Sequence, residues 1–219
     1  MPEKTKKEVQ PQAREYFEKG ITALRKDNLD YATKLFEQAL RREPGFFECR
    51  EALRLNQFKR SSKKSGLFKM FGKTTSTSLL PKGQLALKKD PLEAIEVAEQ
   101  VLNDDPYSVM GNKLLADAAT TAGFPRTALF AWDLVMQKHP DDKANTMRYC
   151  QALVNNGDVV KAEETCTALA KAHPGDQEVQ QLSKNLTASR TLSEGGYDKV
   201  ASGESDYRAV LKDEAEAVL

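Results

Sequence analysis

The sequence predicts an all-α fold, a right-handed α-solenoid of helix–turn–helix repeats that ends in a C-terminal capping helix. Four times an alanine is followed after four, seven and twelve residues by an apolar residue, a second apolar residue and a proline. Offsets of four and seven place three residues on one face of a helix, and a proline cannot continue that helix. The last three prolines of this pattern are Pro106, Pro140 and Pro174, and they follow one another at intervals of 34 residues. Such a period indicates stacked repeats, each packing on its sequence neighbours.

The composition is that of a polar globular protein. Of 219 residues, 40% are hydrophobic and 30% are charged, and no apolar run approaches the roughly 18–20 residues that cross a bilayer. The first residues, Met1 to Gln12, are charged and lack the apolar stretch of a signal peptide. The three cysteines stand at unrelated spacings and predict neither a metal cluster nor a disulfide framework. We therefore expect a reducing, cytoplasmic location.

The net charge of +1 hides an uneven distribution. Nine basic residues and no acidic residue lie between Lys59 and Lys89, which leaves 24 basic against 32 acidic residues in the rest of the chain. A basic segment is thus embedded in an acidic body, and it can attract anionic partners.

The repeats divide the chain in order. A flexible N-terminus (1–10) precedes the solenoid (11–192), and a linker with an amphipathic tail helix (193–219) follows it. Within the solenoid we expect four repeats and the capping helix, at about 13–46, 47–108, 109–142, 143–176 and 177–192. The second repeat is longer than the others because it contains the basic insertion, at about 60–80.

Residues at the expected helix ends support these divisions. Asp90 before Pro91 offers an N-cap and a first-turn proline, Gly123 before Pro125 offers a glycine stop, and Gly157 precedes Asp158. The first helix of the second repeat stays ambiguous, because either Phe46–Lys59 or Pro81–Lys89 could fill that place. For the former, the candidate packing residues are Phe47, Ala52, Leu53 and Leu55.

These residues resemble the tetratricopeptide repeat, whose helix–turn–helix unit has 34 residues. The first repeat carries the family's aromatic, glycine, alanine, phenylalanine, alanine and proline sites at Tyr16, Gly20, Ala32, Phe36, Ala39 and Pro44. Later repeats carry Ala94 and Pro106; Ala128, Trp132 and Pro140; and Ala162, Cys166 and Pro174, with Trp132 and Cys166 in place of phenylalanine. The resemblance implies a scaffold that binds an unidentified protein or peptide.

The resemblance also implies where a partner would bind. The first helix of each repeat lines the family's concave groove, and by register its positions here are Phe17, Ile21 and Leu24; Lys113, Asp117 and Thr120; and Met147, Gln151 and Val154. Phe17 and Ile21 stand where chaperone-binding members have the Lys and Asn of a carboxylate clamp. The sequence therefore disfavours the binding of a chaperone tail.

Two residue types invite a chemical interpretation. His139 and His173 each precede a repeat-ending proline, where an imidazolium suits a helix C-terminus, and no ligand spacing supports a metal site. Cys150 and Cys166 occupy sites that pack the two helices of one repeat in the family. They are buried inert thiols or, as the alternative, a redox-sensitive pair.

The sequence contains no glycine-rich phosphate loop, no nucleophile elbow and no paired-acid motif. We therefore expect no catalytic residue, no cofactor and no metal, and we interpret the chain as a non-enzymatic adaptor.

The basic insertion supports a competing hypothesis. Three interpretations of this insertion stay open. The insertion is a solvated loop, or it contacts an anionic membrane surface, or it contacts nucleic acid, although the sequence has no motif that reads bases. In the second case the chain would be a tether, peripheral to a membrane. Its surface residues would be Lys63, Lys64, Phe68, Lys69, Phe71 and Lys73.

Overall fold

The computed structural model describes residues 2–63 and 78–194, and every named element within them is an α-helix. The chain divides into two compact units, Met1–Pro140 and Asp141–Leu219. The first unit contains α1 (Pro11–Arg25), α2 (Leu29–Arg42), α3 (Phe47–Lys63), α5 (Pro91–Asp104), α6 (Val109–Ala122) and α7 (Pro125–Lys138). The second contains α8 (Lys143–Asn155), α9 (Val159–Ala172) and α10 (Gln177–Glu194). Residues 78–87 are also helical.

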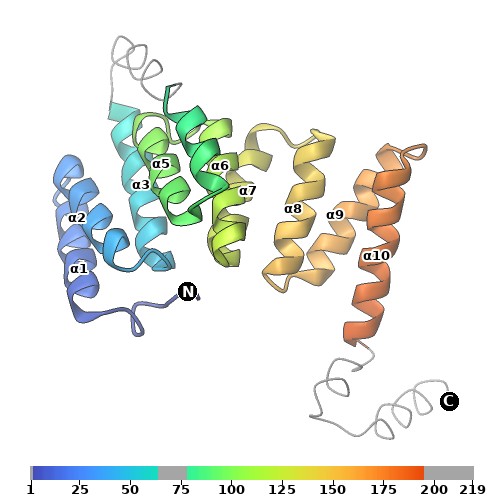
Figure 1. Cartoon of the computed structure of the whole chain (residues 1–219), viewed down its shortest axis with the longest axis horizontal. Coiled ribbons are helices and arrows are strands. Elements are labelled where there is room, and N and C mark those ends of the chain that lie inside the picture. Colours follow the sequence, from blue (N-terminus) through green and yellow to red (C-terminus); the bar gives the residue numbers. More distant parts are fainter. Residues whose placement is uncertain (1, 64–77, 195–219) are drawn as a thin grey trace, which may run out of the picture. The chain divides into compact units, whose positions relative to one another are not determined.

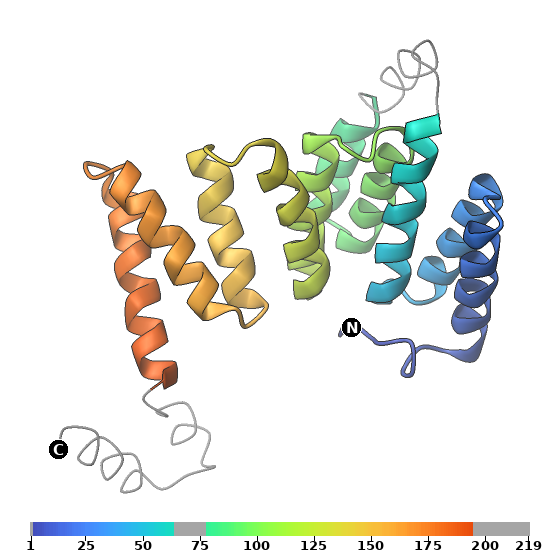
Figure 2. The same ribbon diagram turned by 180° about the vertical axis from the view of Figure 1, so that it is seen from behind.

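Helices that follow one another along the chain pack together (Figures 1 and 2). In the first unit α1 packs on α2, α2 on α3, α5 on α6 and α6 on α7. In the second unit α8 packs on α9, and α9 on α10. This serial pairing confirms the predicted all-α class, built from stacked helix–turn–helix repeats.

The second helix of each repeat ends at the same register. α2, α5, α7 and α9 each end two residues before the proline of the period, at Pro44, Pro106, Pro140 and Pro174. The residue after each helix donates its backbone N–H to the carbonyl four positions back, on Ala39, Val101, Val135 and Leu169. The proline that follows lacks an N–H group and cannot extend the ladder. The sequence period is thus a period of helix ends.

The turns use the residues that the sequence predicted. The Asp90 carboxylate accepts hydrogen bonds from the N–H groups of Leu92 and Glu93 at the start of α5. Gly123, which ends α6, has a φ of +76°, a left-handed value that favours glycine. Asp158 precedes α9 as expected, but its side chain makes no capping hydrogen bond.

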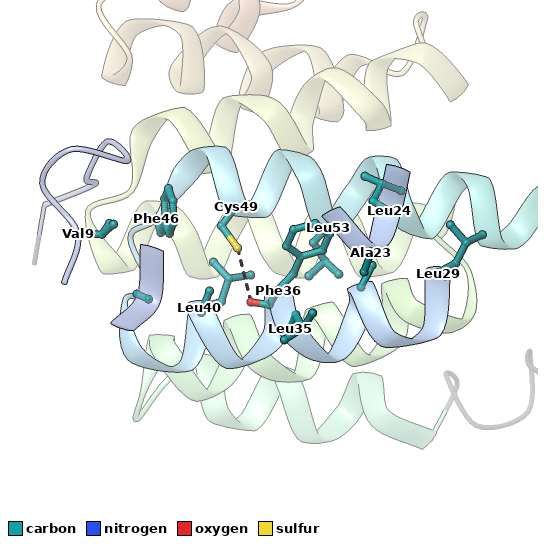
Figure 3. Close-up of a cluster of buried hydrophobic side chains, with 13 residues drawn as sticks. Val9, Ala23, Leu24, Leu29, Leu35, Phe36, Leu40, Phe46, Cys49 and Leu53 are labelled. Carbon is teal, nitrogen blue, oxygen red and sulfur yellow. Dashed lines mark hydrogen bonds between the residues drawn. The ribbon is translucent and has the colours of Figure 1, made fainter. Parts of the chain in front are cut away.

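The core of the first repeat is apolar and close-packed (Figure 3). Gly20 on α1 faces Phe36 on α2 so closely that an added Cβ would lie 2.5 Å from the phenylalanine Cε1. Phe36 is fully buried, and the thiol of Cys49 donates to its carbonyl at 3.5 Å (Figure 3). The family glycine is therefore present because two helices approach closely at this point.

The alanines of the repeat pattern are buried. Each of these alanines is at most 1% exposed. The two residues that replace the family phenylalanine are also buried, with Cys166 fully buried and Trp132 3% exposed. The alanines are Ala32, Ala39, Ala94, Ala128 and Ala162.

Both candidate helices of the long second repeat form, and they pack in different places. α3 continues to Lys63, past the Lys59 at which we predicted its end, and packs mainly on α2. Residues 78–87 pack on α5 and α6, since a Cβ added at Gly83 would meet Leu114 and Val97. Leu55, which we predicted to pack, is 51% exposed. That prediction was wrong because the buried face of α3 includes Leu53, Arg54 and Asn56, and Leu55 lies outside that face.

Candidate partner-binding face

The predicted groove residues of α1 border an open hollow on the first unit. Phe17 and Ile21 line it together with Lys6, Glu18, Thr22 and Arg25. The ring of Phe17 is half-buried and lies 4.9 Å from the ring of Phe46 and 6.2 Å from that of Phe36, measured between centroids. The floor of the hollow is therefore apolar and held in place by the core, while its rim carries charges of both signs.

Leu24, the third position on α1, is 7% exposed and belongs to the core cluster (Figure 3). It does not line the hollow and presents little surface to a partner. A residue at this register was predicted to face the groove, but in α1 it belongs to the buried core.

The matching positions on α6 and α8 are more polar or more open. On α6, Lys113 and Asp117 are half-buried, and the exposed Thr120 donates its hydroxyl to the Ala116 carbonyl. On α8, Gln151 is exposed and Val154 is half-buried, while Met147 packs against a small core of Leu169, Ala170 and Val179. These side chains can contact a partner, and on α1 two apolar groove residues lie together at one hollow.

A second recess was not predicted. It lies between α2, α3 and α5, and its lining residues include Leu40, Leu53 and Ile95 on the apolar side and Arg50 and Glu99 on the polar side. Arg50 and Arg54 are each 1% exposed, and Glu99 is 8% exposed. The recess therefore ends on buried charged groups.

The buried charges form a network between α3 and α5. Arg50 donates to Glu99 Oε1 at 2.9 Å and Arg54 donates to Glu99 Oε2 at 3.4 Å. Arg50 also donates to the Pro44 carbonyl at 2.6 Å, and Arg54 donates to the side chain of Gln57. Burial lowers the pKa of Arg54, and the nearby Glu99 carboxylate opposes that shift.

The same network reaches α2. Gln57 donates to Asn103 at 2.8 Å, and Asn103 donates to Glu37 at 2.7 Å. The sequence did contain a signal for it, since Arg50, Arg54 and Gln57 follow one another at intervals of four and three residues and share a helical face. A stripe of this kind is usually solvated, so the sequence alone does not place it in the interior.

The cysteines are buried thiols. Cys150 and Cys166 are fully buried, and burial raises the pKa of Cys150 to about 12, with the Cys166 thiol beside it adding to the effect. Burial also raises the pKa values of Cys166 and Cys49. Thiols with raised pKa values are poor nucleophiles at neutral pH because little thiolate is present.

The two histidines occupy the predicted helix ends. His139 follows α7 and His173 follows α9, each as the C-cap residue. Within residues 2–63 and 78–194, no group of three or more His, Cys, Asp or Glu side chains is placed to hold a metal ion. In the same stretch no helix is both long enough and apolar enough to cross a membrane.

The predicted anionic-surface residues fall largely outside the described residues, namely Lys64, Phe68, Lys69, Phe71 and Lys73. Lys63 is described, and its ammonium group forms an ion pair with Asp27. Its neighbour Arg60 pairs with Asp30 at 2.7 Å. The start of the basic segment is thus partly neutralised by acidic groups at and next to the turn between α1 and α2.

Paired helices that end at a constant proline register define this chain as a helical-repeat protein. Residues 119–186 match the family model described as "Tetratricopeptide repeat". This stretch is therefore similar to tetratricopeptide repeats, the family that the sequence period resembles.

Comparison with curated protein sequences gives no match. Among solved structures, similar chains include MamA RS-1 as an ArsTM double mutant, with 15% identity, coverage of 95% of this chain and 98% of that chain, and a TM-score of 0.49. The complex of the TPR2AB domain of yeast Sti1 with pHSP90 has 14% identity, coverage of 80% and 69%, and a TM-score of 0.42. TTC0263, a thermophilic TPR protein of Thermus thermophilus, has 17% identity, coverage of 94% and 98%, and a TM-score of 0.37.

Proposed function

We propose that this chain is a non-enzymatic adaptor that binds a peptide segment of a partner protein at the groove positions of its repeats. The match to the tetratricopeptide repeat supports a role in protein–protein interaction, because such repeats stack into extended binding surfaces. The observation that carries the proposal is the hollow on α1, where two predicted groove residues form an apolar floor beneath a charged rim.

The hollow is suited to a partner side chain because its floor is fixed before binding. Phe17 packs between Phe36 and Phe46, so its ring loses little freedom when a ligand covers it. Arg25 and Glu18 stand at the rim and can bond to the polar backbone of a peptide. An apolar anchor with polar groups around it is the usual composition of a binding site for a peptide side chain.

Peptides selected by display against the full chain provide the test. Thr22 is exposed and lines the hollow, so a Thr22→Trp variant fills the space without disturbing the core. We expect this variant to bind the selected peptides at least about tenfold more weakly, as measured by fluorescence anisotropy. The matched control is Tyr31→Trp on α2, which places the same side chain at an exposed position, 52% for Tyr31, that does not line the hollow. Equal binding by the Thr22→Trp variant and the unaltered chain overturns the proposal.

The tether to an anionic surface stays the alternative hypothesis. Its six side chains include one, Lys63, whose charge is already paired with Asp27. Sedimentation with anionic lipid vesicles at low and high salt separates the two functions, because binding through the basic segment weakens with salt whereas an apolar anchor in the hollow does not.

A further inference from the structure

The N-terminal segment lies across the first unit as an arm, which we define as Pro2–Val9. Figures 1 and 2 show it running from the start of α1 toward α3 and α7. We expected these residues to be flexible, yet each part of the arm has a specific partner. Val9 is 3% exposed in the core of the first repeat (Figure 3), and Arg14 donates hydrogen bonds to the carbonyls of Lys6, Lys7 and Val9. The arm is thus anchored to α1 at its C-terminal end.

An acidic side chain of the arm caps a distant helix. The Glu3 carboxylate accepts hydrogen bonds from the N–H groups of Arg126 and Thr127, both at 2.8 Å, and from the Thr127 hydroxyl at 2.6 Å. These groups form the first turn of α7, and the residue that precedes this helix, Phe124, makes no side-chain capping bond of its own. The start of α7 is therefore completed by a carboxylate from another part of the chain.

The next residue of the arm is held by its backbone and by its charge. The Lys4 N–H donates to the Gly45 carbonyl at 2.8 Å, and Lys4 pairs with Phe46 in a parallel β-bridge. The Lys4 ammonium group lies 2.8 Å from Glu43, whose side chain is 3% exposed. A chain segment that docks here gains a backbone hydrogen bond of the kind that an added strand makes.

A second basic residue of the arm reaches the hollow on α1. The Lys6 ammonium group lies 2.9 Å from Glu18 and 5.9 Å from the centroid of the Phe17 ring. Its backbone N–H donates to Glu48 Oε1 at 3.4 Å, while the other oxygen of Glu48 is buried without a hydrogen-bond partner among the described residues. The arm therefore covers one edge of the hollow and leaves an acceptor unused.

We propose that the surface beneath the arm is a docking site for an extended peptide of a partner protein, and that the arm occupies it as an intramolecular competitor. We name this surface the cradle and define it as Glu43–Glu48, the first turn of α7, Glu18 and Phe17. Its contacts specify an acidic residue, then a basic residue, and a second basic residue two positions later, as in Glu3, Lys4 and Lys6. The inference rests on the proposed function, since it gives the chemistry of the partner that enters the hollow.

The contacts of the arm are of a kind that a partner can replace. The Lys6–Glu18 pair is exposed on both sides, at 47% and 55%, and exposed pairs contribute little to stability. Val9 and Arg14 hold the arm to α1 beyond the cradle, so its first residues can leave without unfolding the helix. An arm tethered beside its site competes with an effective concentration of about millimolar, which a partner must overcome through its concentration or its affinity.

The test uses the full chain with the arm neutralised by Glu3→Gln, Lys4→Gln and Lys6→Gln. The probe is a fluorescent peptide with the sequence of residues 2–8. We expect the neutralised chain to bind this peptide at least about tenfold more tightly than the unaltered chain, because the competing arm no longer occupies the cradle. A second peptide that carries glutamine in place of Glu3 should lose that binding.

A cradle variant checks the location. Thr127→Val, made in the neutralised chain, removes the hydroxyl that bonds to the carboxylate while keeping the buried volume, and should weaken the probe about tenfold. Circular dichroism verifies that each variant remains helical. If the folded, neutralised chain binds the probe no better than the unaltered chain up to about 1 mM peptide, the inference is overturned.

The outcome is separable from that of the proposed function. If display-selected peptides bind the Thr22→Trp variant more weakly, while neutralising the arm does not change the affinity for the probe peptide, the proposed adaptor function is supported and the competing arm is excluded. If the neutralised chain binds the probe but Thr22→Trp leaves selected peptides unaffected, the cradle stands and the hollow is not the partner site.

Discussion

Two helix junctions in the first unit are held together by different interactions. Between α1 and α2 the contact is apolar, with Gly20 against the fully buried ring of Phe36. Between α3 and α5 the contact is ionic, with Arg50 and Arg54 against Glu99. The first junction lies within a regular repeat, whereas the second occurs where the chain departs from the period. The difference shows that the regular stack needs only small and large apolar residues in register, while its interruption needs a specific set of polar groups.

The ionic junction is geometrically demanding. Each guanidinium of the network must align with one oxygen of Glu99, and the Nε atoms of Arg50 and Arg54 still have no hydrogen-bond partner among the described residues. Taking charges out of water costs several kcal/mol per ion, so such a network contributes little net stability. We infer that its role is to fix how α3 lies on α5, because only one arrangement satisfies the shared carboxylate.

The largest expected effect is the loss of that carboxylate. Glu99→Ala leaves two buried guanidinium groups without their anion and should lower the free energy of unfolding by about 3–5 kcal/mol. Chemical denaturation followed by circular dichroism measures the change. A loss of less than about 1 kcal/mol would show that water reaches the two arginines, contrary to their exposure of 1% each.

A matched replacement sharpens the interpretation. If the network supplies geometry rather than stability, replacing all three charges together, with Arg50→Met, Arg54→Leu and Glu99→Leu, should cost much less than Glu99→Ala alone and can even stabilise the fold. The same variant should loosen α3 on α5, which faster amide hydrogen exchange in α3 would report. A triple variant as unstable as the single one would contradict this role.

The next effect concerns the apolar junction. Gly20→Ala places a Cβ 2.5 Å from the Phe36 ring and should destabilise the chain by about 1–3 kcal/mol, despite the better helix propensity of alanine. Thermal unfolding measures the loss. Combining it with Phe36→Leu, which withdraws the ring, should give a double variant less unstable than the sum of the two changes. Additive losses would mean that the two residues do not meet.

The contrast between the junctions also shows how far the sequence could be interpreted. Helix ends were predictable because proline, glycine and Asp90 act through local backbone chemistry, and the positions of Gly20 and Phe36 in the repeat were identified through the resemblance, although their contact was not predicted. Leu55 was misplaced because the face that a helix buries depends on what packs against it. The hydrogen bond between Glu3 and Thr127 joins residues more than one hundred positions apart, and no local sequence pattern predicts it.

Changes at the N-caps of α5 and α9 should have a smaller effect on the free energy of unfolding, and one of the two serves as a control for the other. Asp90→Ala removes a side chain that accepts two backbone hydrogen bonds at the start of α5, and it should cost about 1 kcal/mol. Asp158→Ala changes the same residue type at the start of α9, where the side chain makes no capping bond, and should cost clearly less. Denaturant midpoints of the two variants decide the comparison. Equal losses would mean that the acidic charge near the helix start matters and the capping geometry does not.

The smallest effect is a pH dependence in the second unit. The Lys143 ammonium group, 2.7 Å from Asp176, holds the pKa of that carboxyl below its usual value, and the N–H groups of Val179 and Glu178 act in the same direction. Because the pKa is lower in the folded chain, the stabilisation is present above the ordinary value of about 3.9 and is lost as the pH falls through the folded pKa. Lys143→Met should therefore flatten the dependence of the unfolding temperature on pH in this acidic range.

Arg190 provides the matched control for this measurement. It lowers the pKa of Glu163 through a hydrogen bond of 2.7 Å, so the Glu163 contribution has the same sign and should persist in the Lys143→Met variant. Arg190→Met should remove that contribution and leave the one from Asp176. If neither variant changes the acid limb of the curve, these partly exposed pairs contribute nothing measurable, and the stability of the second unit comes from its buried residues, among them Leu153, Leu169 and Val179.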